Sequence, residues 1–173
     1  KSYDRDSFDT AVVIPHDSML KPEIEKLGVR VIEADGIADC SFSFKAIKAL
    51  DEIFKEEAPD IVHTHASLSA RIAAKKNGIK VVHTRHCLED EKKGIKKLIY
   101  KLINNSLSDR VIAVSDAVSE NLTSDGIAES KLRTVYNGIT PLKELSEEER
   151  KKARTEYGIR DSEVVVGIVA RLE

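Results

Sequence analysis

Two patterns of apolar and polar residues alternate along this chain. Short runs rich in β-branched residues are separated by stretches in which apolar residues recur every three or four positions. The clearest helical stretch is 44–57, with Ile47, Leu50, Ile53 and Phe54 on one side. The predicted strands are 10–14, 29–33, 60–65, 80–83, 110–115, 133–136 and 164–172. The other predicted helices are 68–76, 92–107, 116–124 and 146–157.

This order of elements predicts an α/β fold with a doubly wound, Rossmann-like parallel sheet. Several of the strands contain Ile-Val, Val-Val or Val-Ile-Ala-Val, which is typical of strands with helices on both faces. Strands that alternate with helices favour right-handed β-α-β crossovers and therefore parallel pairing.

The two ends of the chain predict that it is cut from a longer protein. It opens on a polar stub, and its single methionine is Met19. The strand at 164–172 reads as fully buried, yet no helix follows to cover it. We expect one Rossmann-like domain over 1–140. Residues 141–173 would then hold an interdomain linker, a charged helix and the first strand of a second domain.

Composition excludes several classes of protein. The 173 residues are 41% hydrophobic and carry 28 lysines and arginines against 30 acids, a net charge of −2, which argues against a nucleic-acid binder. No apolar run is long enough to span a bilayer, and the first ten residues do not resemble a signal peptide. Cys40 and Cys87 do not form a CxxC motif, which favours a reducing, cytoplasmic setting.

Four of the five histidines gather at two predicted strand ends. His63 and His65 project from one face of their strand, at the carboxyl end where open α/β sheets bind ligands. His83 belongs to the next strand, and His86 falls just beyond it. If those strands are neighbours, the histidines form a site, with His83 as the one most readily placed in the core.

Three uses of this cluster remain open on the residues alone. Imidazoles at neutral pH can recognise polar ligands and move protons. Paired histidines on one strand can also bind zinc or a similar metal ion, as in metal-dependent hydrolases, although no acidic ligand stands out. The third use is local packing and hydrogen bonding.

The stretch 92–107 predicts an amphipathic, basic helix. Five lysines lie between Lys92 and Lys101 without an intervening acid. The apolar positions are Ile95, Leu98, Ile99, Leu102 and Ile103. Such a helix can contact an anionic membrane, but packing of the apolar stripe in the core is the favoured interpretation.

Five segments in order carry a resemblance to a known family. They are Pro-Asp-Ile-Val-His-Thr-His at 59–65, Val-Val-His-Thr-Arg-His at 81–86, Asp-Arg-Val-Ile-Ala-Val-Ser at 109–115, Val-Tyr-Asn-Gly-Ile at 135–139 and Val-Val-Gly-Ile-Val-Ala-Arg-Leu at 165–172. Their order and spacing resemble the N-terminal half of GT-B glycosyltransferases of the GT4-like group. The resemblance covers nearly the whole chain, although Thr140 stands where an aspartate commonly follows Asn-Gly-Ile.

The resemblance implies retaining transfer of a sugar, of the hexosyltransferase type, from a nucleotide-sugar donor to an acceptor. The donor would be a UDP-, GDP- or ADP-sugar, and the acceptor a glycan or lipid-linked molecule, as in polysaccharide biosynthesis. His86 matches the catalytic histidine near the reacting carbon of the donor sugar. Arg171 matches the residue that contacts the donor diphosphate. Substrate binding is assigned to His63, His65, Arg85 and Ser115; no metal and no other cofactor is implied.

The resemblance also implies what this chain lacks. The family's first strand, with its glycine-rich loop, would precede Lys1, and the donor domain with its Glu-x7-Glu motif would follow Glu173. We therefore expect the chain alone to be inactive. In the cell we expect a cytoplasmic protein, peripheral at the inner face of the membrane through Lys92–Lys101. The alternatives are a metal-dependent hydrolase that uses the histidines and a non-catalytic sugar- or nucleotide-binding module.

Overall fold

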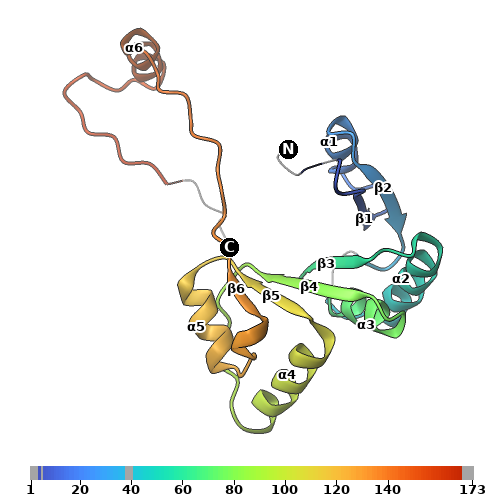
Figure 1. Ribbon diagram of the computed structural model, residues 1–173. Coiled ribbons are helices and arrows are strands. Elements are labelled where there is room, and N and C mark those ends of the chain that lie inside the picture. Colours follow the sequence, from blue (N-terminus) through green and yellow to red (C-terminus); the bar gives the residue numbers. More distant parts are fainter. Residues whose placement is uncertain (1–3, 5, 38–40, 169–173) are drawn as a thin grey trace. The chain divides into compact units, whose positions relative to one another are not determined.

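The computed structural model describes residues 4, 6–37 and 41–168 (Figure 1). They fall into two compact units that divide after Asn137. The first unit alternates strands and helices, and the second contains a single helix. The strands are β1 (Ala11–Pro15), β2 (Arg30–Ala34), β3 (Ile61–His65), β4 (Lys80–Arg85), β5 (Arg110–Ala113) and β6 (Leu132–Thr134). The helices are α1 (Lys21–Lys26), α2 (Phe44–Glu57), α3 (Leu68–Lys76), α4 (Gly94–Leu107), α5 (Asp116–Ser124), the 3-10 turn η1 (Glu129–Lys131) and α6 (Glu147–Glu156).

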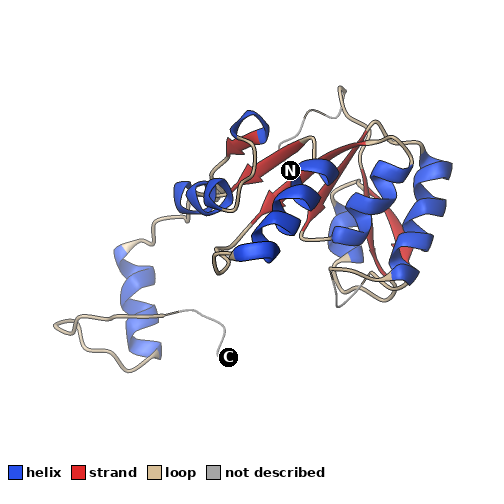
Figure 2. Cartoon of the chain, turned by 90° about the horizontal axis from the view of Figure 1, so that it is seen from below, coloured by secondary structure: helices blue, strands red, loops and turns tan. Residues whose placement is uncertain are grey.

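All strand pairings in the described residues are parallel. β1 pairs with β2, and a second sheet has the order β3-β4-β5-β6. Because this second sheet is built in one direction with right-handed crossovers, its helices α3, α4 and α5 are placed on the same face. The predicted α/β, Rossmann-like arrangement of parallel strands and crossover helices is confirmed (Figure 2).

Serine caps explain where three of the helices begin. The side chains of Ser43, Ser67 and Ser115 accept hydrogen bonds from the backbone N–H three residues later, at the starts of α2, α3 and α5. Each cap satisfies one of the N–H groups that a helix leaves without a partner at its first turn. Each of the three helices therefore begins directly after its capping serine.

Two apolar clusters hold the first unit together. In one, α2 and α3 pack on β3 and β4, and it includes Leu50, Phe54, Val62 and Val81. The other joins α5 to β5 and β6. Its members are Val111, Ala113, Val118, Leu122, Ile127 and Leu132. The paired strand residues of both clusters share one face of the sheet, because the parallel register places Val62 beside Val81 and Val111 beside His83.

Most predicted elements agree with the structure to within a few residues, but three details differ. The pattern did not predict α1 or η1, which are short and have no buried residues. The strands form two sheets instead of one, because among the described residues neither β1 nor β2 pairs with a strand of the β3-β4-β5-β6 sheet. The expectation that the first strand of the family is missing from this chain stays a prediction.

The predicted strand at 164–172 is not formed in its described part. Residues 164–168 pair with no other strand, and the side chains of Val164, Val166 and Ile168 are exposed. An extended segment needs the hydrogen bonds of a neighbouring strand, and none of the described residues provides one. Residues 169–173 lie outside the described part. Their assignment to the start of a second domain stays a prediction.

The favoured interpretation of the 92–107 helix is wrong. The apolar side chains of α4 are exposed, and only Asn104 is buried on this helix. The side that meets the rest of the unit is polar, because Tyr100 and Asn104 bind two buried arginines, Arg85 and Arg71. These hydrogen bonds, and not the apolar stripe, decide which way the helix faces.

The second unit is a helix with well-defined ends. Ser146 and Glu149 form a capping box at the start of α6, each side chain accepting from the other residue's backbone N–H. After the helix, Arg154 donates to the carbonyls of Arg160 and Glu163. α6 has no buried residue, as its mixed charges predict. No helix in the described residues is long and apolar enough to cross a membrane.

Leu122 tests the second cluster, since its side chain is only 1% exposed. Leu122→Ala should lower the free energy of unfolding by about 2–5 kcal/mol, from lost burial and the cavity left behind. Urea unfolding followed by circular dichroism measures this change. The control is Leu142→Ala, at a leucine that is 91% exposed, and it should change the stability by less than about 0.5 kcal/mol. Equal effects of the two substitutions would contradict this account of the core.

Candidate functional site

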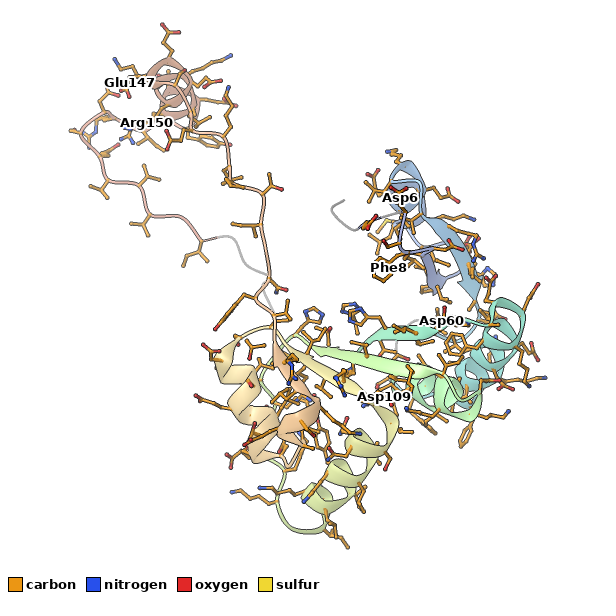
Figure 3. All side chains as sticks on the ribbon, in the orientation of Figure 1. Asp6, Phe8, Asp60, Asp109, Glu147 and Arg150 are labelled. Atoms are coloured by element: carbon orange, nitrogen blue, oxygen red, sulfur yellow. The ribbon has the colours of Figure 1, made fainter. Side chains whose placement is uncertain are left out.

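The histidines meet at the carboxyl edge of the four-stranded sheet. β3 and β4 are parallel neighbours, with His65 paired in register with Thr84, and His86 follows the last residue of β4. Figure 3 labels Asp60 and Asp109, which precede β3 and β5 and so mark the opposite, amino edge. Parallel strands bring their carboxyl ends together, which is where open α/β sheets bind ligands. The predicted juxtaposition of the two histidine motifs is confirmed.

Three imidazoles form a continuous cluster at this edge. His65 Nδ1 lies 2.7 Å from His86 Nε2, a hydrogen bond in which one ring donates and the other accepts. The rings of His63 and His65 have centroids 4.6 Å apart, and those of His65 and His86 are 5.0 Å apart and nearly parallel. His63 Nε2 also makes a 2.7 Å hydrogen bond with Thr84 Oγ1. All three histidines are exposed, so the cluster is open to a ligand.

Alternation along β3 explains why these rings point away from the core. Val62 and Thr64 are buried on the face that α3 covers, whereas Ile61, His63 and His65 are exposed on the other. Directly after His65 the chain turns sharply, and Ala66 takes a left-handed conformation with φ of 71°. This turn leads to the Ser67 cap of α3. The histidines therefore lie between a rigid strand and a capped helix.

The fourth histidine, His83, lies on the covered face and is buried, as predicted. Its Nδ1 is 3.3 Å from the hydroxyl of Thr64. Burial and the neighbouring charge of Arg71 lower the pKa of His83 to about 4. Burial also lowers the pKa of His63 and of His65, with further lowering from the adjacent histidines. These three rings are therefore neutral at pH 7.

Arg85 lies beside His86 in the sequence, but its side chain is only 6% exposed and turns inward. Its guanidinium donates to the carbonyl of Cys87 at 3.1 Å and to the hydroxyl of Tyr100, and it pairs with Glu89 at 2.8 Å. These contacts hold the loop that carries His86. Direct binding of substrate by Arg85 stays a prediction.

A second buried arginine lies close to the first. Arg71, on α3, is 7% exposed and donates to Asn104 Oδ1 at 2.5 Å. Burial lowers the pKa of Arg71, and among the described residues its Nε has no hydrogen-bond partner. We call Arg71, Arg85, Tyr100 and Asn104 the arginine layer. It underlies the carboxyl edge and carries positive charge.

The remaining predicted site residues have other positions. Ser115 follows β5 at the same edge, where its hydroxyl caps α5 by accepting from Val118 N–H at 3.3 Å. Arg171 lies outside the described residues. Two open hollows in the described part are lined by other residues, among them Lys101 and Lys131 in one and Arg133 in the other. Neither hollow is lined by a histidine, and the rings of His63, His65 and His86 are exposed.

Sequence reasoning missed Arg71, Tyr100 and Asn104. In the sequence, Arg71 and Asn104 read as solvent-exposed positions of amphipathic helices, and nothing in their spacing pairs them. The one signal in the sequence is the i, i+4 spacing of Tyr100 and Asn104, which puts them on the same side of the predicted helix. In the described residues no three His, Cys, Asp or Glu side chains are arranged to hold a metal ion.

The comparisons with known proteins agree on the fold. The model of Glycosyltransferase Family 4 matches residues 2–141. A glycosyltransferase from Rickettsia africae is similar over 88% of this chain and 42% of its own, with 24% identity and a TM-score of 0.70. Anabaena Alr3699/HepE, solved in complex with UDP and glucose, has 18% identity and a TM-score of 0.63 over 86% of this chain and 42% of its own. Among curated proteins none matches the sequence.

Other solved structures are sugar-nucleotide epimerases. The UDP-GlcNAc 2-epimerase from Neisseria meningitidis, bound to UDP-GlcNAc, has 19% identity and a TM-score of 0.50 over 72% of this chain and 37% of its own. The chain spans about 42% of the length of the first glycosyltransferase structures that it resembles.

The parallel strands and their crossover helices form a Rossmann-like domain of the GT-B type, the N-terminal half of that fold. The chain belongs to glycosyltransferase family 4. Membership of this family does not favour the hydrolase or the non-catalytic module as alternatives.

Buried His83 predicts a pH dependence of stability. Its pKa is about 4 in the folded protein and about 6.5 in the unfolded chain, so unfolding takes up a proton between these values. The free energy of unfolding should therefore rise with pH from about 4 to 6.5, by roughly 3 kcal/mol from this group. Urea unfolding at several pH values measures the slope. His83→Gln cannot titrate and should flatten it; an unchanged slope in this variant would contradict the assignment.

Proposed function

We propose that this chain is the acceptor-side half of a retaining glycosyltransferase that moves a sugar from a nucleotide-sugar donor. The observation that supports this most is the hydrogen-bonded pair of His65 and His86 at the carboxyl edge of a family 4 domain. An exposed imidazole pair at that edge provides N–H donors and lone pairs for the hydroxyl groups of a sugar.

In this proposal His86 is the catalytic residue and contacts the donor sugar near its reacting carbon. His65 holds the His86 ring through their hydrogen bond, and His63 extends the surface that binds substrate. Ser115, at the neighbouring strand end, is a further substrate contact. Arg85 is a positioning residue, because its guanidinium binds the carbonyl of Cys87 in the loop of His86.

The departing diphosphate gathers negative charge as the sugar leaves it. We assign Arg171 to this group, since a guanidinium can donate two parallel hydrogen bonds to a phosphate. Donors placed in advance where charge develops lower the barrier of the reaction. The proposal needs no metal ion for this step.

The donor is a nucleotide sugar, with uridine diphosphate sugars as the first to test. Structures similar to this chain contain UDP, UDP-glucose or UDP-GlcNAc. GDP- and ADP-sugars are the other candidates. The acceptor is a glycan or a lipid-linked molecule of polysaccharide biosynthesis. We place the protein in the cytoplasm, in peripheral contact with the inner face of the membrane through Lys92–Lys101.

His86→Ala should reduce sugar transfer by the protein at its full natural length by about a hundredfold or more, through the loss of a contact to the reacting sugar. Transfer is measured with radiolabelled UDP-, GDP- and ADP-sugars and an acceptor extract. The matched control is Cys87→Ala at the adjacent exposed residue, which should keep full activity. NMR of the product should show the donor's anomeric configuration. Full activity of the His86 variant, or inversion, would refute the proposal.

The 173-residue chain by itself should show no transfer under the same conditions. In this proposal Arg171 is one contact of a larger donor site, and the chain spans about 42% of the length of the similar glycosyltransferase structures. Transfer at more than background rate by this purified chain would contradict the expected division of the site.

A further inference from the structure

Helix α4 presents its apolar side chains to the outside of the unit. Ile95 is 74% exposed, Leu102 is 58% exposed and Leu98 is 55% exposed. An ordinary surface helix turns such a stripe toward the core. We call the side formed by Ile95, Leu98, Ile99, Leu102 and Ile103 the outer face of α4.

The arginine layer fixes this orientation. On the inner side of α4, Tyr100 accepts from Arg85 and Asn104 accepts from Arg71, while Asn104 also donates to the carbonyl of Tyr100 at 2.8 Å. Turning the helix to bury its leucines would withdraw these partners from two buried guanidinium groups. Burying an unpaired charge is more costly than exposing several aliphatic side chains. The exposure of the outer face therefore follows from the hydrogen bonds of the arginine layer.

Lysines border the outer face. At about 100° per residue, Lys101 follows one edge of the stripe and Lys96 follows the other, whereas Lys97 lies on the opposite side of the helix, near Asn104. Lys92 and Lys93 precede the helix, and the sequence has no acid from 92 to 108. Lys92 pairs with Glu89, but among the described residues Lys96 and Lys101 form no ion pair. Lysines therefore give the apolar stripe a border that carries positive charge only.

We propose that α4 lies in the interfacial plane of an anionic lipid bilayer, with its outer face in the acyl region and its lysines among the lipid phosphates. The apolar stripe matches the acyl region and the lysines match the anionic headgroups, because the bilayer interface is apolar within and anionic at its surface. An uncharged protein partner would cover the apolar stripe but would not explain why only positive charges border it. At 14 residues α4 is about 21 Å long, which suits a helix that lies on a membrane.

This inference deepens the proposed function, because it names the residues and the geometry of the membrane contact. It does not depend on which sugar is transferred. α4 lies on the helix-covered face of the sheet, whereas His63 and His65 lie on the opposite face, so the membrane contact and the histidine edge are separate surfaces of the unit.

Vesicle flotation of the protein at its full natural length tests the proposal. The vesicles are pure phosphatidylcholine, or phosphatidylcholine with 30% phosphatidylglycerol. We expect strong binding to the anionic vesicles, weak binding to the neutral ones and release by high salt. Each lysine charge near an anionic surface strengthens binding by about fivefold. Lys96→Gln with Lys101→Gln should therefore weaken binding on the order of twentyfold.

The matched controls lie on exposed positions of the second unit. Lys151→Gln with Lys152→Gln removes the same charge from α6 and should leave binding unchanged. Leu98→Gln with Leu102→Gln should abolish binding, whereas Leu142→Gln with Leu145→Gln, at exposed leucines, should not. Thermal unfolding verifies that each variant is folded.

Three outcomes would overturn the proposal. The first is that the natural sequence does not float with anionic vesicles. The second is that the α4 variants and the control variants lose equal amounts of vesicle binding. The third is a halved light-scattering mass in the Leu98 and Leu102 variant, which would show that the outer face joins two copies. Transfer to a soluble acceptor is assayed in parallel. Vesicle binding without transfer would refute the proposed activity alone, and transfer without vesicle binding would refute the membrane contact alone.

Discussion

Two guanidinium groups buried beneath the carboxyl edge of the sheet determine much of this domain. Arg71 and Arg85 are each more than nine-tenths buried, and Glu89 is the one carboxylate paired with either of them among the described residues. Such charges are tolerated inside a protein only when hydrogen bonds surround them. Tyr100, Asn104 and the carbonyl of Cys87 provide those bonds. The position of α4 and that of the loop of His86 both follow from this requirement.

The arginine layer also connects the two surfaces to which we assign function. On one side it borders the histidine cluster, through Arg85 and the adjacent His86. On the other it turns the apolar stripe of α4 outward. A single set of buried contacts therefore positions both the loop of His86 and the exposed stripe of α4.

The histidines themselves show how a strand pairing creates chemistry. His65 and His86 are separated by 20 residues, and each is unremarkable in its own segment. Parallel pairing of β3 with β4 brings their ring nitrogens to 2.7 Å. Because the second ring accepts what the first donates, the pair acts as one polar unit. Partial burial and the neighbouring imidazoles lower the pKa of His65.

The sequence by itself determined the order and type of the elements, because β-branched runs and three-to-four spacing reflect local backbone preferences and burial on a face. It also determined that His63, His65 and His86 stand at strand ends, since alternation along a strand and the carboxyl-edge rule need no partner to be known. The tertiary structure alone decided the direction of α4 and the state of residues 164–168. Both depend on contacts between distant residues: Arg71 finds Asn104 across 33 positions, and an apolar strand forms only where another strand can pair with it.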